Sequence, residues 1–334
     1  MPPRTALITG ISGQDGSYLA EMLEARGYRV FGMVKTTAGP QAEAVSQLLP
    51  SVELVEGDLQ DLASLITVVE TTGPDEVYNL AALSSVSRSW SQPELTAEVT
   101  GLGPLRLLEA IRLAGRTGST RFYQASSSEM FGRALVFPQD EDTPFSPVHP
   151  YAVAKVFAHH TTVNYRSVHG MFAVCGILFN HESPRRGEEF VTRKITRGVA
   201  RIGLGLQESL VLGNLDVRRD WGYAPEYVEA MWMMLQRSEP DDFVIATGVT
   251  HSVRDFLDAA FTEIGVDDWS PFVRHDEALV RPTDITELRG NAAKARSALG
   301  WRPLTDFEGL VRLMVAADME RERARLDPAR PADG

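Results

Sequence analysis

The stretch TALITGISGQDGSYLAEMLEARGYRVFGMVK, residues 5–35, decides the fold of this chain. An apolar run ends at Gly10, and further glycines follow at Gly13 and Gly16. A second apolar run, Arg29 to Val34, comes about 20 residues after the turn. Glycines at such a turn let the backbone approach a pyrophosphate, and the N–H groups at the start of the following helix attract the same anion. The stretch therefore predicts a strand, a turn, a helix and a second strand that together bind a dinucleotide.

The residues after the second strand bear on the choice of cofactor. An acidic residue there would bind the free ribose 2′-hydroxyl of NAD. This chain instead has Lys35 followed by Thr36 and Thr37, a cation and two hydroxyls that suit a 2′-phosphate. The sequence favours NADP, with NAD as the alternative if Lys35 is only a solvated surface charge.

Composition excludes several classes of partner. With 334 residues, a net charge of -12 and a pI near 5.1, the chain does not suit nucleic acid or an anionic membrane as its main partner. Its one cysteine, Cys175, lies in an apolar run, and no apolar run approaches the length that spans a bilayer. The seven histidines lack a metal-ligand spacing. We expect a soluble cytoplasmic protein without a metal.

Strands and helices alternate beyond the first unit. Predicted strands at 52–56, 76–82 and 121–125 are separated by helices from Leu62 and over 95–113, and a further helix begins near Tyr151. Alternation predicts an α/β fold, here a Rossmann doubly wound parallel sheet with a smaller, mainly C-terminal α/β substrate domain. Ligands bind beyond the carboxyl ends of such strands. The strand ends that we expect around one cleft are Asp58 to Leu59, Ala81 to Ala82, Ser126 to Glu129 and Asn180 to His181.

Changes in composition along the chain suggest the domain boundaries. Residues 1–179 are predicted to form the dinucleotide-binding domain, with 213–249 returning to it, and 180–212 and 250–330 to form a cap. Basic residues gather at 193–197, 218–219 and 281 on an otherwise acidic chain. They suggest a cap that grips phosphates, while solvated arginines are the alternative.

Four residue types suggest the chemistry. Tyr151 and Lys155 lie one turn apart on a predicted helix, where the ammonium, with an oxidised nicotinamide nearby, would lower the pKa of the phenol and make it a base. The hydroxyl of Ser127, at a strand end, could orient the same substrate hydroxyl, or it could satisfy backbone groups there. Glu129 adds a carboxylate that can remove a carbon-bound proton next to a ketone, which is elimination chemistry. Alternatively, Glu129 stabilises a helix N-terminus.

Five longer motifs extend from the first strand to beyond the middle of the chain. They are LITGISGQDGSYLAE (7–21), YQASSSE (123–129), LFNHESPRRG (178–187), FVTRKI (190–195) and RDWG (219–222). With these motifs, and over a match that reaches about Pro303, the chain resembles the extended short-chain dehydrogenase/reductase superfamily and, within it, the GDP-mannose 4,6-dehydratases. Gln14 to Gly16 and the block from Asn180 to Lys194 carry most of this resemblance.

The resemblance implies oxidation of the mannose C4 hydroxyl, loss of water across C5 and C6, and return of the hydride to C6. The catalytic residues it implies are Ser127, Glu129, Tyr151 and Lys155. The cofactor-binding residues it implies are Gly10, Gly13, Gln14, Asp15, Gly16, Lys35, Asp58, Leu59, Ala81, Ala82, Tyr151, Lys155, His181 and Arg186, with Arg185 as an alternative to Arg186. The residues it implies for the GDP-sugar are Ser84, Asn180, Val191, Lys194, Gly213, Arg219, Arg281 and Asp284. It also implies a homodimer or homotetramer.

Several positions depart from the family pattern. One basic residue, Lys35, stands where the family usually has two, and the loop up to Val52 is short. Ala81 to Ser85 and Asp284 replace Gly-Ala-Gln-Ser-His and a glutamate. Because these positions are expected to line the cleft, a dehydratase of another GDP-sugar, such as a GDP-heptose, is an alternative. An NDP-sugar 4-epimerase or 4-ketoreductase and a dinucleotide-sensing binding protein are the others.

Overall fold

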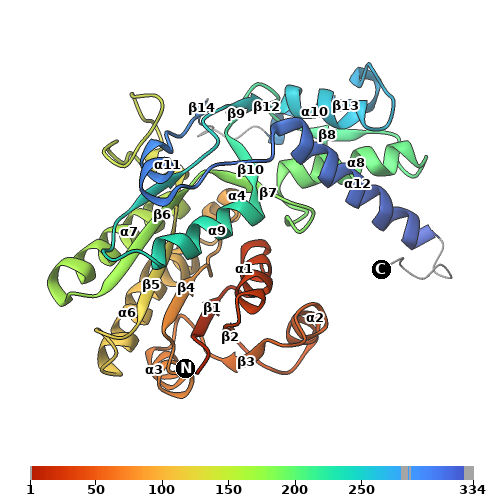
Figure 1. The fold of residues 1–334 in the computed structure, drawn as a ribbon. Helices are drawn as coiled ribbons and strands as arrows, with labels where there is room; N and C mark the ends of the chain where they lie inside the picture. The colour runs from red at the N-terminus through yellow and green to blue at the C-terminus, as the bar shows by residue number, and fades with distance from the viewer. Residues whose placement is uncertain (1, 280–284, 286, 327–334) are drawn as a thin grey trace.

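The computed structural model describes residues 2–279, 285 and 287–326. Its centre is a seven-stranded, wholly parallel sheet (Figure 1). From one edge to the other, the strands are β11 (Phe243–Ile245), β6 (Phe172–Leu178), β5 (Arg121–Ser127), β4 (Glu76–Asn79), β1 (Thr5–Thr9), β2 (Arg29–Val34) and β3 (Glu53–Glu56). The strand order reverses between β1 and β4, which is the place where doubly wound sheets bind ligands.

Both faces of this sheet are buried, because neighbouring residues of each strand enter different cores. On β1, Ala6 and Ile8 pack into one core while Leu7 packs into the other. Tyr78 and Val77 of β4 divide in the same way. Strands covered on both faces read as continuous apolar runs, and this explains the apolar stretches in the sequence.

Helices cover the two faces of the sheet. The first core contains residues of α1 (Gln14–Ala25), α2 (Pro40–Leu48), α9 (Ala224–Leu235) and α11 (Ala293–Leu299). The second contains residues of α3 (Leu62–Thr72) and α6 (Gly103–Leu113), with Tyr165 of α7 (Pro150–His169) packed against it. The predicted doubly wound α/β fold is therefore confirmed.

A separate apolar core lies at one end of the molecule, where α8 (Val191–Gly203), α10 (Val253–Thr262) and α12 (Phe307–Leu326) gather (Figure 1). Its aromatic centre is formed by Trp221, Phe256 and Phe307, with ring centroids 5.3 to 6.2 Å apart. Short strands join this part to the rest: β7 (Asn180–Glu182) with β10 (Trp221–Tyr223), β8 (Leu210–Leu212) with β13 (Val273–His275), and β9 (Arg218–Arg219) between β12 (His251–Ser252) and β14 (Glu287–Leu288).

The segment 213–249 contributes to both parts of the molecule. Its helix α9 packs on α1 and its strand β11 joins the large sheet, whereas its strand β9 pairs in the smaller one. Ala292, Ala295 and Trp301 also lie in a core of the large sheet. The division into two domains by residue number stays a prediction.

The predicted helix over 95–113 is confirmed as one helical run, which contains a π-helical turn. α4 (Val86–Ser91) and α5 (Pro93–Thr96) lead into a π-helical turn, η1 (Ala97–Leu102), before α6 begins at Gly103. Pro104 has no N–H to donate, so the regular helical bond at that position is lost. A Cβ at Gly103 would lie 2.9 Å from the Leu59 side chain. A closely packed glycine and a proline therefore mark the point where the π-helical turn gives way to the regular helix.

The other predicted elements agree more closely with the structure. The second predicted strand and β2 have the same bounds, and α3 begins at Leu62 as expected. Among the described residues, no helix is long and apolar enough to cross a membrane.

Candidate active site

A cavity of about 1280 Å³ lies at the carboxyl ends of the central strands, between the large sheet and the cap. All the predicted site residues that fall within the described part of the chain line this cavity. Arg281 and Asp284, which were predicted to bind substrate, lie outside the described residues. The geometry thus brings the predicted set together, and the role of each residue stays a prediction.

The glycine turn at the head of α1 forms one wall. Gly10 has a φ of 73°, and a Cβ there would lie 2.8 Å from the backbone nitrogen of Ala81. A Cβ at Gly16 would lie 2.8 Å from Cα of Ile11. The N-cap residue Gly13 caps α1 without a side chain. Only glycine fits these positions, and the resulting bare helix N-terminus faces the cavity, as a pyrophosphate site requires. The residues present therefore fit a dinucleotide.

The residues after β2 are arranged differently from the expectation. Lys35 lies at the cavity and pairs with Asp58 across 3.0 Å. The backbone N–H and hydroxyl of Thr37 both donate to Glu56, each at 2.8 Å. The Thr37 hydroxyl, which was expected to bind a 2′-phosphate, is thus already bonded to a carboxylate. Of Lys35, Thr36 and Thr37, only Lys35 lines the cavity. The NADP preference stays a prediction.

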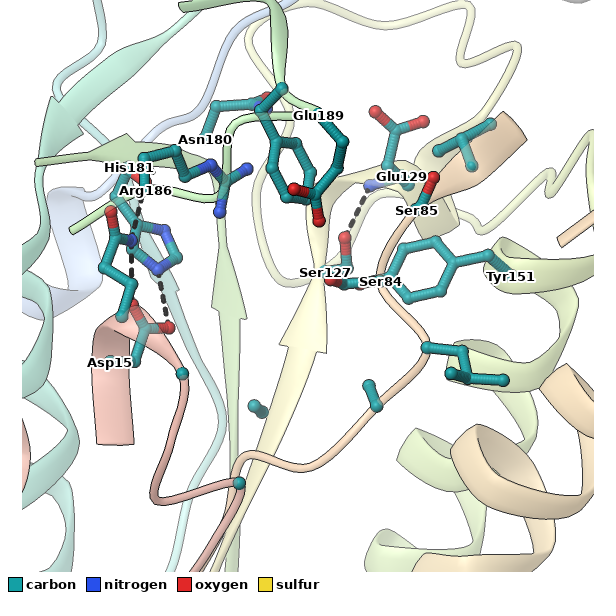
Figure 2. A pocket seen from close by; sticks show the side chains of 18 of the residues that line it. Asp15, Ser84, Ser85, Ser127, Glu129, Tyr151, Asn180, His181, Arg186 and Glu189 are labelled. Carbon is teal, nitrogen blue, oxygen red and sulfur yellow. Dashed lines mark hydrogen bonds and ion pairs between the residues drawn. The ribbon is translucent and has the colours of Figure 1, made fainter. Parts of the chain in front are cut away.

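Asp15 and His181 form a buried ion pair across the cavity wall (Figure 2). Nδ1 of His181 lies 2.8 Å from the backbone carbonyl of Phe179, and Nε2 lies 2.8 Å from the Asp15 carboxylate. Both ring nitrogens face acceptors, so the ring is a cation. Burial alone would raise the pKa of Asp15 and lower the pKa of His181, but the attraction between them outweighs it in both groups.

Two further contacts fasten β7 to α1 beside this pair. Gln14 donates to the His181 carbonyl at 3.1 Å and accepts from the Ser183 hydroxyl at 2.8 Å. The sequence placed Gln14, Asp15 and His181 at the cofactor but did not predict that they bond one another, since the two segments lie more than 160 residues apart.

The predicted catalytic residues converge on the other side of the cavity. Ser127 ends β5, Glu129 follows in η2 (Ser128–Phe131), and Tyr151 lies at the start of α7 (Figure 2). Lys155 lies one turn further along α7 and also lines the cavity. The Tyr151 ring points toward Ser127, and the two side chains share a hydrogen bond. The Ser127 hydroxyl also accepts from the backbone N–H of Glu129 at 3.2 Å. The role of Ser127 in satisfying a backbone group is therefore observed, and its role in orienting a substrate hydroxyl stays a prediction.

The protein groups alone do not lower the pKa of the Tyr151 phenol, and the lowering expected from Lys155 together with an oxidised nicotinamide stays a prediction. Burial raises this pKa to about 12; the Ser127 hydrogen bond opposes the increase and the Glu129 charge adds to it. Lys155 Nζ lies 5.7 Å from the tyrosine ring centre and donates to the Ala125 carbonyl at 2.6 Å. Burial also lowers the pKa of Lys155 to about 8. Activation of the phenol therefore needs a further positive charge.

His149 is a functional neighbour that the sequence reading missed. Its Nε2 lies 3.0 Å from a carboxylate oxygen of Glu129, and its side chain is 2% exposed. The residue immediately precedes Pro150 at the start of α7, the position of an N-cap. The proline at the first helical position is the sequence signal that could have identified His149 as the N-cap, two residues before Tyr151.

The two adjacent arginines of the RRG motif separate. Arg186 lines the cavity, with its guanidinium 3.6 Å over the Phe190 ring and paired with Glu182. Arg185 turns to α1, where it bonds Glu21 at 2.6 Å and Ser17 at 3.1 Å. The structure therefore favours Arg186 for the role that the sequence left open between them.

The basic helix predicted to grip phosphates mostly does not. Arg193 of α8 is buried against Asp318 of α12, with the charged atoms 2.6 Å apart. Arg197 and Arg201 both bond Glu322 of the same helix, at 2.9 and 2.8 Å. These arginines hold two cap helices together. Lys194, on the next position of α8, is exposed at the cavity instead.

The remaining polar lining is uneven. Arg219 donates to the Ile285 carbonyl at 2.8 Å at one end of the cavity. Glu189 extends a further carboxylate into the cavity (Figure 2). It was not among the predicted residues, because a glutamate in a loop after a glycine has no distinguishing pattern.

One buried cluster has the spacing of a metal site. Ligand atoms of His159, Cys175 and Asp242 lie within 4.8 Å of one another. However, Arg166 bonds both carboxylate oxygens of Asp242, at 2.7 and 2.9 Å. A second cation would have to displace this guanidinium, so the cluster serves packing.

A glycine turn for a dinucleotide, a Tyr–x–x–x–Lys helix and a serine at the end of β5, arranged around one cavity of a doubly wound sheet, define an oxidoreductase-type site of the short-chain dehydrogenase/reductase class. The chain belongs to the GDP-mannose 4,6 dehydratase family, whose model matches residues 7–314.

Known proteins agree with this assignment. The chain is 49% identical to GDP-mannose 4,6 dehydratase 2 of Arabidopsis thaliana, over 98% of this chain and 90% of that protein. It is 46% identical to GDP-mannose 4,6-dehydratase of Vibrio cholerae, over 97% and 96%. The structure of a dTDP-glucose 4,6-dehydratase from Streptomyces venezuelae, with NAD and TYD bound, superposes with a TM-score of 0.83 over 98% of this chain and 100% of that one, at 23% identity. At that identity it bears on the fold alone.

Proposed function

We propose that the protein is a hydro-lyase that converts GDP-mannose to GDP-4-keto-6-deoxymannose and water. The observation that supports this most directly is the Glu129 carboxylate beside Ser127 and Tyr151 in one cavity. An epimerase or ketoreductase needs a tyrosine, a lysine and a hydroxyl donor, whereas a carboxylate at this place supplies a base for a carbon-bound proton.

The first step is oxidation at C4 of the mannose. A bound nicotinamide dinucleotide supplies the hydride acceptor for C4, the hydride donor for C6 and, when oxidised, a positive charge near the phenol. Tyr151 removes the proton of the 4-hydroxyl, and Ser127 holds that hydroxyl through its own. Lys155 stabilises the phenolate from the same face of α7.

The ketone at C4 makes the C5 proton acidic, and Glu129 then removes it. The C5–H electron pair forms the double bond to C6 as the C6 hydroxyl leaves as water, and the proton on Glu129 can accompany that hydroxyl. Hydride from the bound dinucleotide would return to C6, and C5 would gain a proton that balances the one that Tyr151 removed from the 4-hydroxyl. The reaction therefore changes the sugar without net oxidation, and the dinucleotide ends as it began.

The cap supplies groups suited to a nucleoside diphosphate. Asn180, Lys194 and Arg219 line its side of the cavity. The two cations match the charge of a diphosphate, and the Asn180 amide offers a hydrogen bond. By family resemblance, Ser84, Val191, Gly213, Arg281 and Asp284 complete the GDP-sugar site. In this proposal, residues 1–179 with 213–249 bind the dinucleotide, and 180–212 with 250–330 bind the GDP-sugar.

For the dinucleotide, we propose NADP in preference to NAD. Lys35 and the lack of an acidic residue in positions 34–37 at the end of β2 support this, while Glu56 beside Thr37 works against it. A cytoplasmic location also remains our prediction, in keeping with one free, buried cysteine.

For the assembly, we propose a homodimer or a larger homo-oligomer. Trp90, Val153 and Phe157 lie 44 to 56% exposed around a second hollow, of about 510 Å³, on the outer side of α4 and α7. Val153 and Phe157 are one turn apart on the helix that carries Tyr151, so a second copy of this chain could pair its own α7 here. Phe157→Glu should shift the mass measured by light scattering toward the monomer, and Leu304→Glu, in an exposed loop, is the control.

The function is tested by mixing the protein with GDP-mannose and a catalytic amount of NADP and measuring the mass of the product. Loss of one water without net accumulation of NADPH is the expected result. An isomer of unchanged mass would support an epimerase. No reaction with GDP-mannose but loss of water from a GDP-heptose would support the other sugar, for which the substituted wall from Ala81 to Ser85 is the first place to look.

A further inference from the structure

We propose that His149 is a positioning residue for the proton transfer at C5: it fixes the Glu129 carboxylate through a directed hydrogen bond. This inference rests on the proposed function, in which Glu129 is the base. It concerns the N-cap residue of α7, which precedes Tyr151 by two positions and does not line the active-site cavity.

The backbone at the start of α7 fixes the proton of the His149 ring. His149 is the N-cap residue, and its Nδ1 accepts the backbone N–H of Ala152 at 3.1 Å. A nitrogen that accepts from an N–H must offer its lone pair, so Nδ1 carries no proton. In the neutral ring the proton therefore lies on Nε2. The backbone N–H of Ala152 thus sets the tautomer of His149, as the hydrogen-bond partner of one ring nitrogen does for histidines in other sites.

The proton on Nε2 points at Glu129. The Nε2 to Oε2 distance is 3.0 Å, and a carboxylate oxygen can only accept there. The His149 side chain is 2% exposed and that of Glu129 is 16% exposed, so water competes little for this bond. Hydrogen bonds to ionised acceptors are the stronger ones.

The ring is also fixed from a second side. The His149 and Tyr151 rings are nearly parallel, with an angle of 11° and centroids 6.0 Å apart. His149 thus contacts the first turn of α7 and Glu129, and its ring lies beside that of Tyr151. When Glu129 takes the C5 proton on its other oxygen, the bond from Nε2 stays in place, and His149 neither gains nor loses a proton.

Two substitutions separate this role from helix capping. Asn is a favoured N-cap, so His149→Asn keeps an acceptor for the Ala152 N–H, but its amide is too short to span to Glu129. His149→Gln reaches farther and offers an amide N–H to the carboxylate, but Gln is a poor N-cap. The two variants therefore invert the two functions of the histidine. Asp61→Ala is a matched control, because Asp61 caps α3 through the Ala63 N–H at 3.0 Å and does not line the cavity.

The readouts are the melting temperature and two rates from one single-turnover experiment with GDP-mannose and NADP. Absorbance of reduced nicotinamide follows C4 oxidation, and quenched samples analysed by mass follow water loss. We expect His149→Asn to slow water loss by about tenfold or more, with C4 oxidation changed by less than about twofold. Reduced nicotinamide should then persist longer than in the wild type. His149→Gln should recover part of the water-loss rate although its melting temperature is the lower of the two.

The order of the variants decides the inference. If water loss follows melting temperature, with Asn above Gln, His149 only caps the helix and the inference is overturned. Equal slowing of both rates, or unchanged water loss in His149→Asn, also overturns it. Asp61→Ala should lower the melting temperature and leave the ratio of the two rates unchanged. If the wild type shows neither nicotinamide reduction nor water loss, the proposed function has failed instead, which is a different result.

Discussion

Substitution of Glu129 by glutamine should stop the reaction halfway. Glutamine has the same shape, and its amide oxygen can still accept the Nε2–H of His149, a bond of 3.0 Å in the wild type. The fold should therefore lose no more than about 1 kcal/mol of unfolding free energy, the ordinary worth of one hydrogen bond. The base at C5 is removed, however, and a positioned base contributes about 10² to 10⁴ in rate. Water loss should fall by that factor.

The same substitution should not slow the first step. Burial raises the pKa of Tyr151 to about 12, and the Glu129 charge is one of the groups that add to it. Removal of this charge lowers that pKa, so the phenol ionises more readily at a given pH. Oxidation at C4 should proceed at least as fast as in the wild type, with its acidic limb moved to lower pH.

The assay is a single turnover with enzyme-bound NADP, followed by absorbance and by mass. The expected record for Glu129→Gln is a rise of reduced nicotinamide that does not decay, with no dehydrated product. Glu189→Gln, which removes a carboxylate from the same cavity, should still dehydrate far faster than Glu129→Gln. Water loss at the wild-type rate in Glu129→Gln would refute the assignment of the base, and loss of both steps together would show that Glu129 serves binding or structure.

Three other predictions follow from contacts described above. Lys155→Met removes the ammonium 5.7 Å from the Tyr151 ring and should slow C4 oxidation by about 10² or more, measured as the first absorbance phase; an unchanged phase would contradict it. Asp318→Asn leaves the guanidinium of Arg193, whose side chain is 9% exposed, without its counter-ion and should cost about 3–5 kcal/mol in urea unfolding; a cost below about 1 kcal/mol would show that the cation finds another partner. The stability lost in Asp15→Asn should be greatest between pH 3.8 and 6.5, the ordinary pKa values of the two partners, because the pKa of Asp15 is lowered and that of His181 is raised in the fold. The difference in unfolding free energy between Asp15→Asn and the wild type should shrink as the pH rises above 6.5 through the raised pKa of His181. It should also shrink as the pH falls below 3.8 through the lowered pKa of Asp15. A difference that is independent of pH between 5 and 9 would contradict the ion pair.

Local pattern was sufficient where neighbouring residues decide the structure. The bounds of β2 and the start of α3 were predicted because local signals determine both. The structure shows that Asp61 caps α3 through the Ala63 N–H, which is also a local interaction. Strand ends gave the site, since parallel strands direct their carboxyl ends to one edge. This is why Asp58, Ala81, Ser127 and His181 were placed together although they are distant in the sequence.

Long-range pairing was beyond the sequence. Nothing near Arg193 indicates that its partner is Asp318, so a buried ion pair was interpreted as a surface for phosphates. The pKa of Tyr151 depends on burial, which a helix pattern does not measure. The Leu59 side chain that packs against Gly103, where the π-turn ends, is likewise distant in the sequence. In each case the deciding atom lies on another element.

The bonds between β7 and α1 have a consequence for the catalytic cycle. Three bonds join β7 and the residues after it to α1, the helix expected to receive the pyrophosphate. They link Asp15 to His181, Gln14 to Ser183 and Arg185 to Glu21. Movement of β7 away from α1 would have to break several of these bonds at once. A redox-neutral reaction regenerates its coenzyme at each turnover and has no need to exchange it. These bonds therefore suit an enzyme in which the dinucleotide stays bound while successive sugar substrates bind and leave.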